Sequence, residues 1–375
     1  SHKRKNVNYR IMVKGILVWV LVVFQVSVFG QGINFEKLTL EEALIKAKTE
    51  NKYVFVDCYT TWCGPCKRMT EFVFPSEKAG CYFNPKFVCI KLDMGKDDRR
   101  KFGEQYKIVA YPTFLILNSD GTVYHKIVGG SDIDEFIEKV EYGMEKKHSL
   151  GYLERRYEGG KMNKEELREY AFALRIANEK EQFEKVVKEL IPLLSSKERV
   201  KMEYWFLLKD KEYGDEEVDF VITNIKALKR NVGDQIVDEF LYRNYNRMVQ
   251  KYMIRFQNGA LIDKENRKLI RIVLRELENI NVKDKMQLIE QFQFIDAFLR
   301  EDVQGILKVM EQMVVSGQGN QKMIPRILSV VERRDDRGLM LGIITLKDKI
   351  MSVLPEKEQK MCERMIADFN RRMME

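Results

Sequence analysis

The sequence predicts an α/β domain with a mixed central sheet flanked by helices, followed by an all-α helical domain. Between residues 38 and 147, short apolar runs rich in β-branched and aromatic residues alternate with stretches of helical periodicity. Beyond residue 148, strand-like alternation is absent and apolar residues recur at helical spacing. The 375 residues exceed one such α/β module, so we expect two domains, residues 31–148 and residues 149–375.

Within the first domain we expect the element order α-β-α-α-β-α-β-β-α. Thr39 and Glu42 form a capping-box pattern at the first helix. Ser76 and Ser131 are expected to cap two later helices. The turn at residues 118–121 contains Asp-Gly between two apolar runs, which is a strong hairpin signal. The strands are expected over residues 53–59, 87–92, 113–117 and 122–127.

The first 30 residues form a segment of their own. An apolar run over residues 15–30 follows a basic start, which is the order of a secretory signal peptide. The run is short for a spanning helix, which needs about 20 residues. We therefore expect residues 1–30 to be a signal peptide that leads to a periplasmic or secreted location, with an uncleaved membrane anchor as the alternative. The basic residues of this segment are Lys3, Arg4, Lys5, Arg10 and Lys14.

The net charge of +8 comes mostly from that segment, which contains no acidic residue. The rest of the chain is close to neutral. It also lacks a basic stripe with interleaved aromatic residues, so we expect no nucleic acid among the partners. Contact with a membrane is expected only through the N-terminal segment, if that segment is not cleaved.

Cys63 and Cys66 form a C-x-x-C between a predicted buried strand and a predicted helix. Cys63 would lie at the helix N-terminus, where unpaired N–H groups and the helix dipole favour a thiolate. Such a position lowers a thiol pKa from roughly 8.5 by about one unit or more. Cys66 would lie one helical turn later and could close an intramolecular disulfide. We therefore predict that Cys63 is the more exposed, attacking thiol and that Cys66 resolves.

Two other interpretations of the cysteine pair are weaker. Half of a zinc site would need two further ligands, and none of the three histidines lies near a second C-x-x-C. A purely structural disulfide is the other alternative. The intervening Gly64-Pro65 and the adjacent Trp62 are more typical of an exposed reactive turn. We expect no metal and no cofactor.

Further motifs surround this pair. Residues 62–67 read WCGPCK, Asp57 lies six residues before Cys63, and Lys91 lies in the next predicted strand. Residues 111–113 read YPT, and residues 129–130 are both glycine. Over residues 35–147 the chain resembles the thioredoxin superfamily. Residues 72–77, with no proline before Pro75, look more similar to periplasmic reductase domains of the DsbD C-terminal type.

The resemblance implies a thiol–disulfide oxidoreductase that works through a mixed disulfide, with Cys63, Cys66 and Asp57 as catalytic residues. Asp57 would be buried beside the thiols, where desolvation raises its pKa. It could then take the proton from Cys66 during resolution, and Lys91 would tune it.

The resemblance also assigns Trp62, Tyr111 and Pro112 to substrate binding. Pro112, in the cis form, would hold the preceding backbone open for a substrate strand. Gly64-Pro65 carries no histidine of the kind that oxidising members have, so we expect a reductase of protein disulfides. A reductant in an oxidising compartment must be recharged, which implies a membrane electron donor. The alternative is an interaction protein whose thioredoxin-like head tethers clients without turnover.

The remaining cysteines and the histidine of the hairpin are expected to be structural. Cys58 and Cys89 fall on predicted central strands and Cys362 in a helical core. A disulfide between Cys81 and Cys89 is an open alternative. His125 is expected on the hairpin surface with no role.

Residues 149–375 are expected to form eight to ten helices joined by polar turns. Apolar residues keep helical spacing over residues 236–252 and over residues 288–299. The segment 170–187 faintly resembles a tetratricopeptide helix pair, although no fixed period continues after it. A helical-hairpin array and an irregular bundle therefore both remain open.

Overall fold

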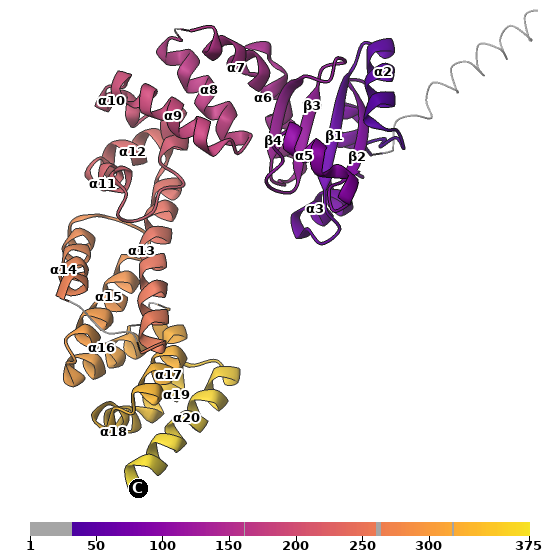
Figure 1. The fold of residues 1–375 in the computed structure, drawn as a ribbon. Coiled ribbons are helices and arrows are strands. Elements are labelled where there is room, and N and C mark those ends of the chain that lie inside the picture. Colours follow the sequence, from indigo (N-terminus) through magenta and orange to yellow (C-terminus); the bar gives the residue numbers. More distant parts are fainter. Residues whose placement is uncertain (1–31, 161, 260–263, 317–318) are drawn as a thin grey trace, which may run out of the picture. The chain divides into compact units, whose positions relative to one another are not determined.

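The computed structural model describes residues 32–160, 162–259, 264–316 and 319–375, so the predicted signal peptide lies outside the described residues. The chain divides into two compact units, one ending at Ser195 and one beginning at Ser196 (Figure 1). The domain boundary after residue 148 remains a prediction, and the first unit continues beyond it. No helix among the described residues combines the length and the hydropathy that crossing a membrane requires.

The first unit is built on a four-stranded mixed sheet in the order β2-β1-β3-β4 (Figure 1). β1 pairs in parallel with β2 and antiparallel with β3, and β3 pairs antiparallel with β4. The predicted order of helices and strands is confirmed. The strands are β1 (Tyr53–Tyr59), β2 (Phe87–Asp93), β3 (Thr113–Leu117) and β4 (Val123–Val128). The helices up to residue 148 are α2 (Leu40–Glu50), α3 (Gly64–Arg68), α4 (Glu77–Phe83), α5 (Arg100–Gln105) and α6 (Ile133–Met144).

Short-range signals decide where these elements begin. Thr39 and Glu42 form the expected capping box of α2, and the Ser76 hydroxyl caps α4. The cap expected at Ser131 is wrong by one residue. Asp132 caps α6, because its carboxylate accepts hydrogen bonds from the N–H groups of the first turn. In the hairpin, Gly121 adopts the positive φ of 83° that the turn requires.

Successive side chains of the sheet enter two different cores. One core is aromatic: the ring centroids of Phe114 and Phe136 are 4.7 Å apart, and those of Phe55 and Phe83 are 4.8 Å apart. The opposite face is aliphatic and packs against α2. The central strands are therefore buried on both faces, which explains their continuous apolar sequence. The aliphatic core includes Val54, Val56, Leu115 and Leu117 of the sheet with Ala43 and Ala47 of α2.

Three further helices of the first unit follow residue 148: α7 (Leu150–Glu158), α8 (Lys164–Ile176) and α9 (Lys180–Leu190). α7 and α8 pack against the strand β4. α7 lies close to the strand, since a Cβ at Gly151 would meet the Val123 carbonyl oxygen at 2.2 Å. α8 and α9 pack together as a helical hairpin (Figure 1). Whether this hairpin is a tetratricopeptide-like repeat remains a prediction.

The cover over β4 overturns the expectation for His125, which is fully buried rather than exposed on the hairpin. Its Nδ1 accepts a hydrogen bond from the Leu150 N–H at 3.2 Å, so the ring is neutral with its proton on Nε2. Burial, with a smaller electrostatic contribution from His148, lowers the pKa of His125 to about 4. Gly143 of α6 provides the necessary space, because a Cβ there would lie 2.2 Å from His125 Cδ2.

Lys126, the next residue of β4, is also buried, with 3% of its surface exposed. Its Nζ lies 2.6 Å from Glu179 Oε1 and donates a hydrogen bond to the Lys107 carbonyl oxygen at 2.9 Å. Glu179 immediately precedes α9. The ion pair therefore links α9 to the sheet within the first unit, a contact that sequence reasoning missed.

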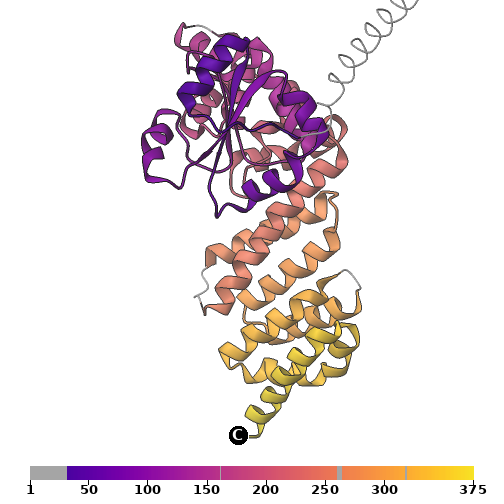
Figure 2. The same ribbon diagram turned by 90° about the vertical axis from the view of Figure 1, so that its right-hand side faces the viewer.

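All regular elements of the second unit are helices in the residues that the structure describes. Along this unit, most helices that are consecutive in sequence lie next to one another (Figures 1 and 2). Fourteen α-helices, α7 to α20, follow residue 148 in the described ranges, which corrects the expected eight to ten. Turns at Asn224 and Leu346 divide runs that look continuous in sequence. The helices of this unit are α10 (Ser196–Arg199), α11 (Glu216–Thr223), α12 (Ile225–Val232), α13 (Asp234–Gln257), α14 (Lys264–Asn279), α15 (Lys285–Leu299), α16 (Val303–Val315), α17 (Ile324–Arg334), α18 (Arg337–Thr345), α19 (Lys347–Val353) and α20 (Glu356–Met374).

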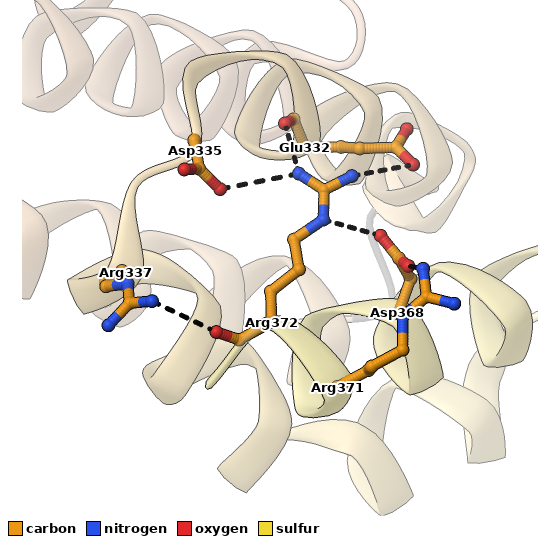
Figure 3. Close-up of polar contacts among 6 residues, drawn as sticks. All are labelled: Glu332, Asp335, Arg337, Asp368, Arg371 and Arg372. Atoms are coloured by element: carbon orange, nitrogen blue, oxygen red, sulfur yellow. Dashed lines mark hydrogen bonds and ion pairs between the residues drawn. The ribbon is translucent and has the colours of Figure 1, made fainter. Parts of the chain in front are cut away.

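The predicted apolar faces of α13 and α15 supply much of this unit's core. Ile236 is an exception, because it is 38% exposed. Cys362 of α20 is buried in the core, as expected. At the C-terminal end, Arg372 of α20 reaches across to α17 and bonds the Glu332 carbonyl oxygen at 3.2 Å (Figure 3).

Candidate functional site

The two cysteines of the C-x-x-C lie where β1 leads into α3. Cys63 is the N-cap residue of α3, and its Sγ accepts a hydrogen bond from the Cys66 N–H at 3.1 Å. The Cys63 N–H in turn bonds the Thr60 carbonyl oxygen at 3.3 Å. The predicted position of Cys63 at a helix N-terminus is confirmed. Unpaired N–H groups at such an end favour negative charge on the sulfur.

Cys63 and Cys66 are joined in a disulfide with an Sγ–Sγ distance of 2.08 Å. In this oxidised form both residues are nearly buried, with 5% of Cys63 and 3% of Cys66 exposed. The alternative disulfide between Cys81 and Cys89 is wrong, because Cys81 is exposed, Cys89 is buried and both are free. Cys58 is buried, and burial raises its pKa well above the usual value, so it behaves as a small apolar residue.

Asp57 lies on β1 directly opposite Lys91 on β2. Only 2% of Asp57 is exposed, and its Oδ2 lies 3.1 Å from Lys91 Nζ. Its Oδ1 is buried without a hydrogen-bond partner among the described residues. Desolvation raises the pKa of Asp57, and the Lys91 charge opposes that rise only in part. The predicted burial, raised pKa and facing lysine are all present.

Lys91 connects this buried carboxylate to the surface. About a quarter of its side chain, 24%, is exposed, and its Nζ also donates a hydrogen bond to Thr70 Oγ1 at 2.9 Å. The ammonium group lies 4.8 Å from the centroid of the Phe74 ring. Such cation–π contacts attract the ammonium group to the aromatic ring in this half-buried position.

Trp62, which directly precedes Cys63, forms an aromatic pair with Tyr111. The Trp62 ring is 73% exposed and meets the Tyr111 ring edge-on, with centroids 6.0 Å apart. The peptide bond between Tyr111 and Pro112 is cis, as predicted. Sequence reasoning missed two further exposed apolar residues, Phe72 and Val109. The sequence did contain a signal for Phe72, because it is a large apolar residue in the helical segment that follows the cysteines.

Comparison with known proteins identifies this arrangement. Residues 40–144 match the family described as thioredoxin-like domain. An H-type thioredoxin from Fagopyrum esculentum is 36% identical over 99 residues, which cover 26% of this chain and 78% of that protein. The chain belongs to the thioredoxin family. A chloroplastic thioredoxin F from Oryza sativa subsp. japonica is 41% identical over 117 residues, or 31% of this chain and 57% of that protein.

A solved structure adds a similarity to a bacterial protein. The solution structure of a proposed disulphide-isomerase from Bacteroides thetaiotaomicron has 45% sequence identity, with a TM-score of 0.29. The match covers 31% of this chain and 96% of that one. The thioredoxin match and the Cys63–Cys66 disulfide make this chain a thiol–disulfide oxidoreductase. The family match ends at residue 144 and assigns nothing to the helices that follow.

Proposed function

We propose that this thioredoxin-like protein reduces disulfide bonds in protein substrates through a mixed-disulfide intermediate, with Cys63 as the nucleophile. The observation that carries the proposal is the position of Cys63 as N-cap of α3, with the Cys66 N–H directed at its sulfur. The same N–H can stabilise a Cys63 thiolate after reduction. Cys66 lies within the first helical turn, close enough to bond Cys63 as the structure has it.

The proposed reaction has two exchange steps. The Cys63 thiolate attacks one sulfur of a substrate disulfide, forms a mixed disulfide and releases the other substrate sulfur as a thiolate. Cys66 then loses its proton and attacks Cys63 Sγ, which releases the second substrate sulfur. Two electrons pass from the dithiol to the substrate. The Cys63–Cys66 disulfide seen here is the oxidised product of that cycle.

Asp57 is the proposed base for the second step. Its raised pKa, caused by burial, makes it a stronger base than an exposed aspartate and suits it to accept the proton of Cys66. Its unpartnered Oδ1 leaves one oxygen able to receive that proton. Lys91, which contacts both Asp57 and the surface, is a positioning residue that opposes the rise in the Asp57 pKa.

Trp62, Tyr111 and Pro112 are the proposed substrate-binding residues. Exposed Phe72 and Val109 would extend this apolar surface. Apolar side chains around a reactive sulfur favour an unfolded or extended substrate segment, because its own apolar side chains lose water on contact. Such a surface fits disulfide-bonded proteins better than a small charged disulfide.

The direction and the compartment are also part of the proposal. Gly64-Pro65 places no charged or titratable side chain between the cysteines. Without added stabilisation of the thiolate, the dithiol should be the better donor. The N-terminal sequence supports export to a periplasmic or extracellular space, where disulfides persist. A reductase there needs a membrane electron donor.

Insulin reduction followed by turbidity tests the proposal. We expect turnover by the full chain and none above the uncatalysed rate for Cys63→Ser. A tether without turnover, the alternative function, would give the same rate for both proteins. Equilibration with glutathione tests the direction: a reductase should have a potential near about −270 mV, and a value near about −120 mV would mark an oxidase. Trapping with Cys66→Ala would then identify the substrates.

A further inference from the structure

A groove lined by basic residues runs along α14 in the second unit. Its first part has a volume of about 760 Å³ and lies between α14 and the junction of α11 with α12. Its second part, of about 440 Å³, lies on α14 itself. Ile272 and Arg275 line both parts, so the two hollows adjoin at these residues. We call this feature the α14 groove.

The lining of the α14 groove is strongly cationic. Among the described residues that line it, Glu276 is the single carboxylate. Glu276 is already engaged, because its Oε2 accepts hydrogen bonds from the hydroxyls of Tyr213 at 2.7 Å and Tyr245 at 3.4 Å. Burial also raises its pKa. The cations of the lining are Lys226, Arg230, Arg267, Lys268, Arg271 and Arg275.

These cations are poorly compensated within the second unit. Arg271 Nε lies 4.0 Å from Asp296, whose other carboxylate oxygen binds Arg300 at 3.0 Å. Arg230 and Arg275 form no ion pair with any residue that the structure describes. Arg267, Arg271 and Arg275 also follow one another at a spacing of four, which places like charges on one face of α14. An anionic partner would relieve this repulsion.

The floor of the groove is aliphatic. It is formed by isoleucines, and Ile272 remains 40% exposed. No aromatic side chain lines either part of the groove in the described ranges, so stacking of nucleic-acid bases has no platform there. A small anion would satisfy the cations but leave the apolar floor uncovered. The isoleucines are Ile222, Ile225, Ile272 and Ile280.

We propose that the α14 groove binds an acidic amphipathic segment of a partner protein. Aliphatic side chains of the segment would cover Ile272 and the rest of the floor, and its carboxylates would face Arg230 and Arg275. This is the helix-in-groove mode of recognition, with charge complementarity setting orientation. Binding does not involve the dithiol, so this inference goes beyond the proposed reductase function, and either can fail without the other.

The probe is a synthetic cysteine-free peptide of about 15 residues, with leucines on one helical face and glutamates on the other. Fluorescence anisotropy with the full chain should give a dissociation constant in the micromolar range, on the order of 10 μM. Binding should weaken as salt rises, because the contacts are between partly exposed charges. A peptide of the same composition with the leucine stripe scrambled should bind at least about tenfold more weakly.

Two matched double variants locate the binding. Arg230→Glu with Arg275→Glu should weaken peptide binding by about tenfold or more. Lys347→Glu with Lys357→Glu makes the same change in charge on exposed residues outside the groove and should change the affinity less than about twofold. If circular dichroism shows that the double glutamate variant has a lower helix content than wild type, Arg230→Gln with Arg275→Gln is used in its place. Ile272→Ser should weaken binding with little change in its salt dependence.

Three results would overturn the proposal. Peptide binding could be absent at about 1 mM. The control pair could weaken binding as much as the groove pair. A single-stranded oligonucleotide or an anionic lipid vesicle could bind more tightly than the peptide and lose that binding in the groove variant, which would assign the groove to another class of partner.

Discussion

Asp57 Oδ2 and Lys91 Nζ lie 3.1 Å apart, on residues that face each other across the parallel strands β1 and β2. The pair is unequal, because Asp57 is buried and Lys91 reaches the surface. The lysine therefore lowers the free-energy cost of burying the ionised carboxylate, but it does not cancel that cost. The pKa of Asp57 stays raised. The first prediction concerns this carboxylate.

Asp57→Asn should slow resolution of the mixed disulfide by about 100-fold, since the variant lacks a base for Cys66. The measurement is the rate at which a preformed mixed disulfide on Cys63 releases its thiol, between about pH 6 and pH 9. An unchanged rate across that range would remove Asp57 from the mechanism. Lys91→Met is a comparison variant that keeps the carboxylate and should raise its pKa further.

The same substitution should change the dependence of stability on pH. The folded protein binds the Asp57 proton more tightly than the unfolded chain, so stability due to this group is present at low pH and is lost as pH rises through the raised, folded pKa. Asp57→Asn should therefore gain stability relative to wild type near pH 8, and that difference should disappear near pH 3. Urea unfolding at the two pH values measures it.

Cys63 should be the thiol that alkylates first after reduction. A thiolate favoured by the α3 N-terminus should react at least about tenfold faster than a thiol of ordinary pKa near pH 7. Cys81 is exposed and would compete, so the experiment uses a Cys81→Ser background. Mass spectrometry after limited labelling with iodoacetamide shows which cysteine is alkylated first. Earlier labelling of Cys66 would reverse the assigned roles.

His125 should make the first unit sensitive to acid. Its folded pKa of about 4 lies below the ordinary 6.5, so stability is present above 6.5 and is lost as pH falls toward 4. The loss attributable to this group should approach roughly 3 kcal/mol. His125→Asn keeps an acceptor for the Leu150 N–H but cannot be protonated there. Hydrogen exchange of β4 amides should lose its acid sensitivity in this variant, and equal sensitivity in both proteins would contradict the assignment.

Gly143→Ala should destabilise the packing of α6 on the sheet. The new Cβ would lie 2.2 Å from His125 Cδ2 and 2.5 Å from Nε2, and the ring has no free space because it is fully buried. Overpacking of this kind costs about 1–3 kcal/mol, which outweighs the roughly 1 kcal/mol that alanine gains over glycine in a helix. Gly103→Ala in α5 is the control, since its nearest contact would be Met94 at 3.4 Å. Hydrogen exchange in α6 measures the difference.

Arg372→Ala should loosen α20 from α17. The guanidinium binds Asp368 at 2.7 Å, Asp335 at 3.4 Å and the Glu332 carbonyl oxygen (Figure 3). The side chain is 34% exposed, so we expect a modest loss of about 1 kcal/mol.

The neighbouring arginine provides the control for that loss. The Arg371 side chain is 72% exposed and contacts Asp368 within α20, but no residue of α17 is joined to it in Figure 3. Arg371→Ala should therefore cost less than about 0.5 kcal/mol. Equal loss of α20 exchange protection in the two variants would mean that the contacts to α17 contribute nothing.

Most of the predicted elements depend on contacts between residues close in sequence. The capping box of Thr39 and Glu42 and the Ser76 cap involve residues three positions apart, so the sequence pattern was sufficient. The Asp-Gly turn fixed the hairpin for the same reason. Ser131 was the exception, since adjacent Ser and Asp are both good caps and the local pattern does not choose between them. In the structure Asp132 is the residue that caps α6.

Side chains whose partners lie far along the chain were predicted less well. Lys126 falls within the predicted strand 122–127, but its partner Glu179 is 53 residues away. Nothing local to β4 indicates that α7 and α8 will pack against it. Ile236 was predicted on a buried apolar face but is exposed. Helical spacing indicates which side of a helix is apolar, but it does not say how much of that side the neighbouring helices cover.

The sequence by itself determined the α/β order of the first unit, the helical character of the second, and the placement of Cys63 at a helix start, because periodicity, caps and turns act over a few residues. Tertiary structure alone decided that His125 is buried and neutral, that Cys81 and Cys89 stay unpaired, and that the cations of α14 and α12 line one groove. Each of these depends on how elements far apart in the sequence pack together, which decides whether a side chain is buried and which side chains become neighbours. No single stretch of sequence carries that information.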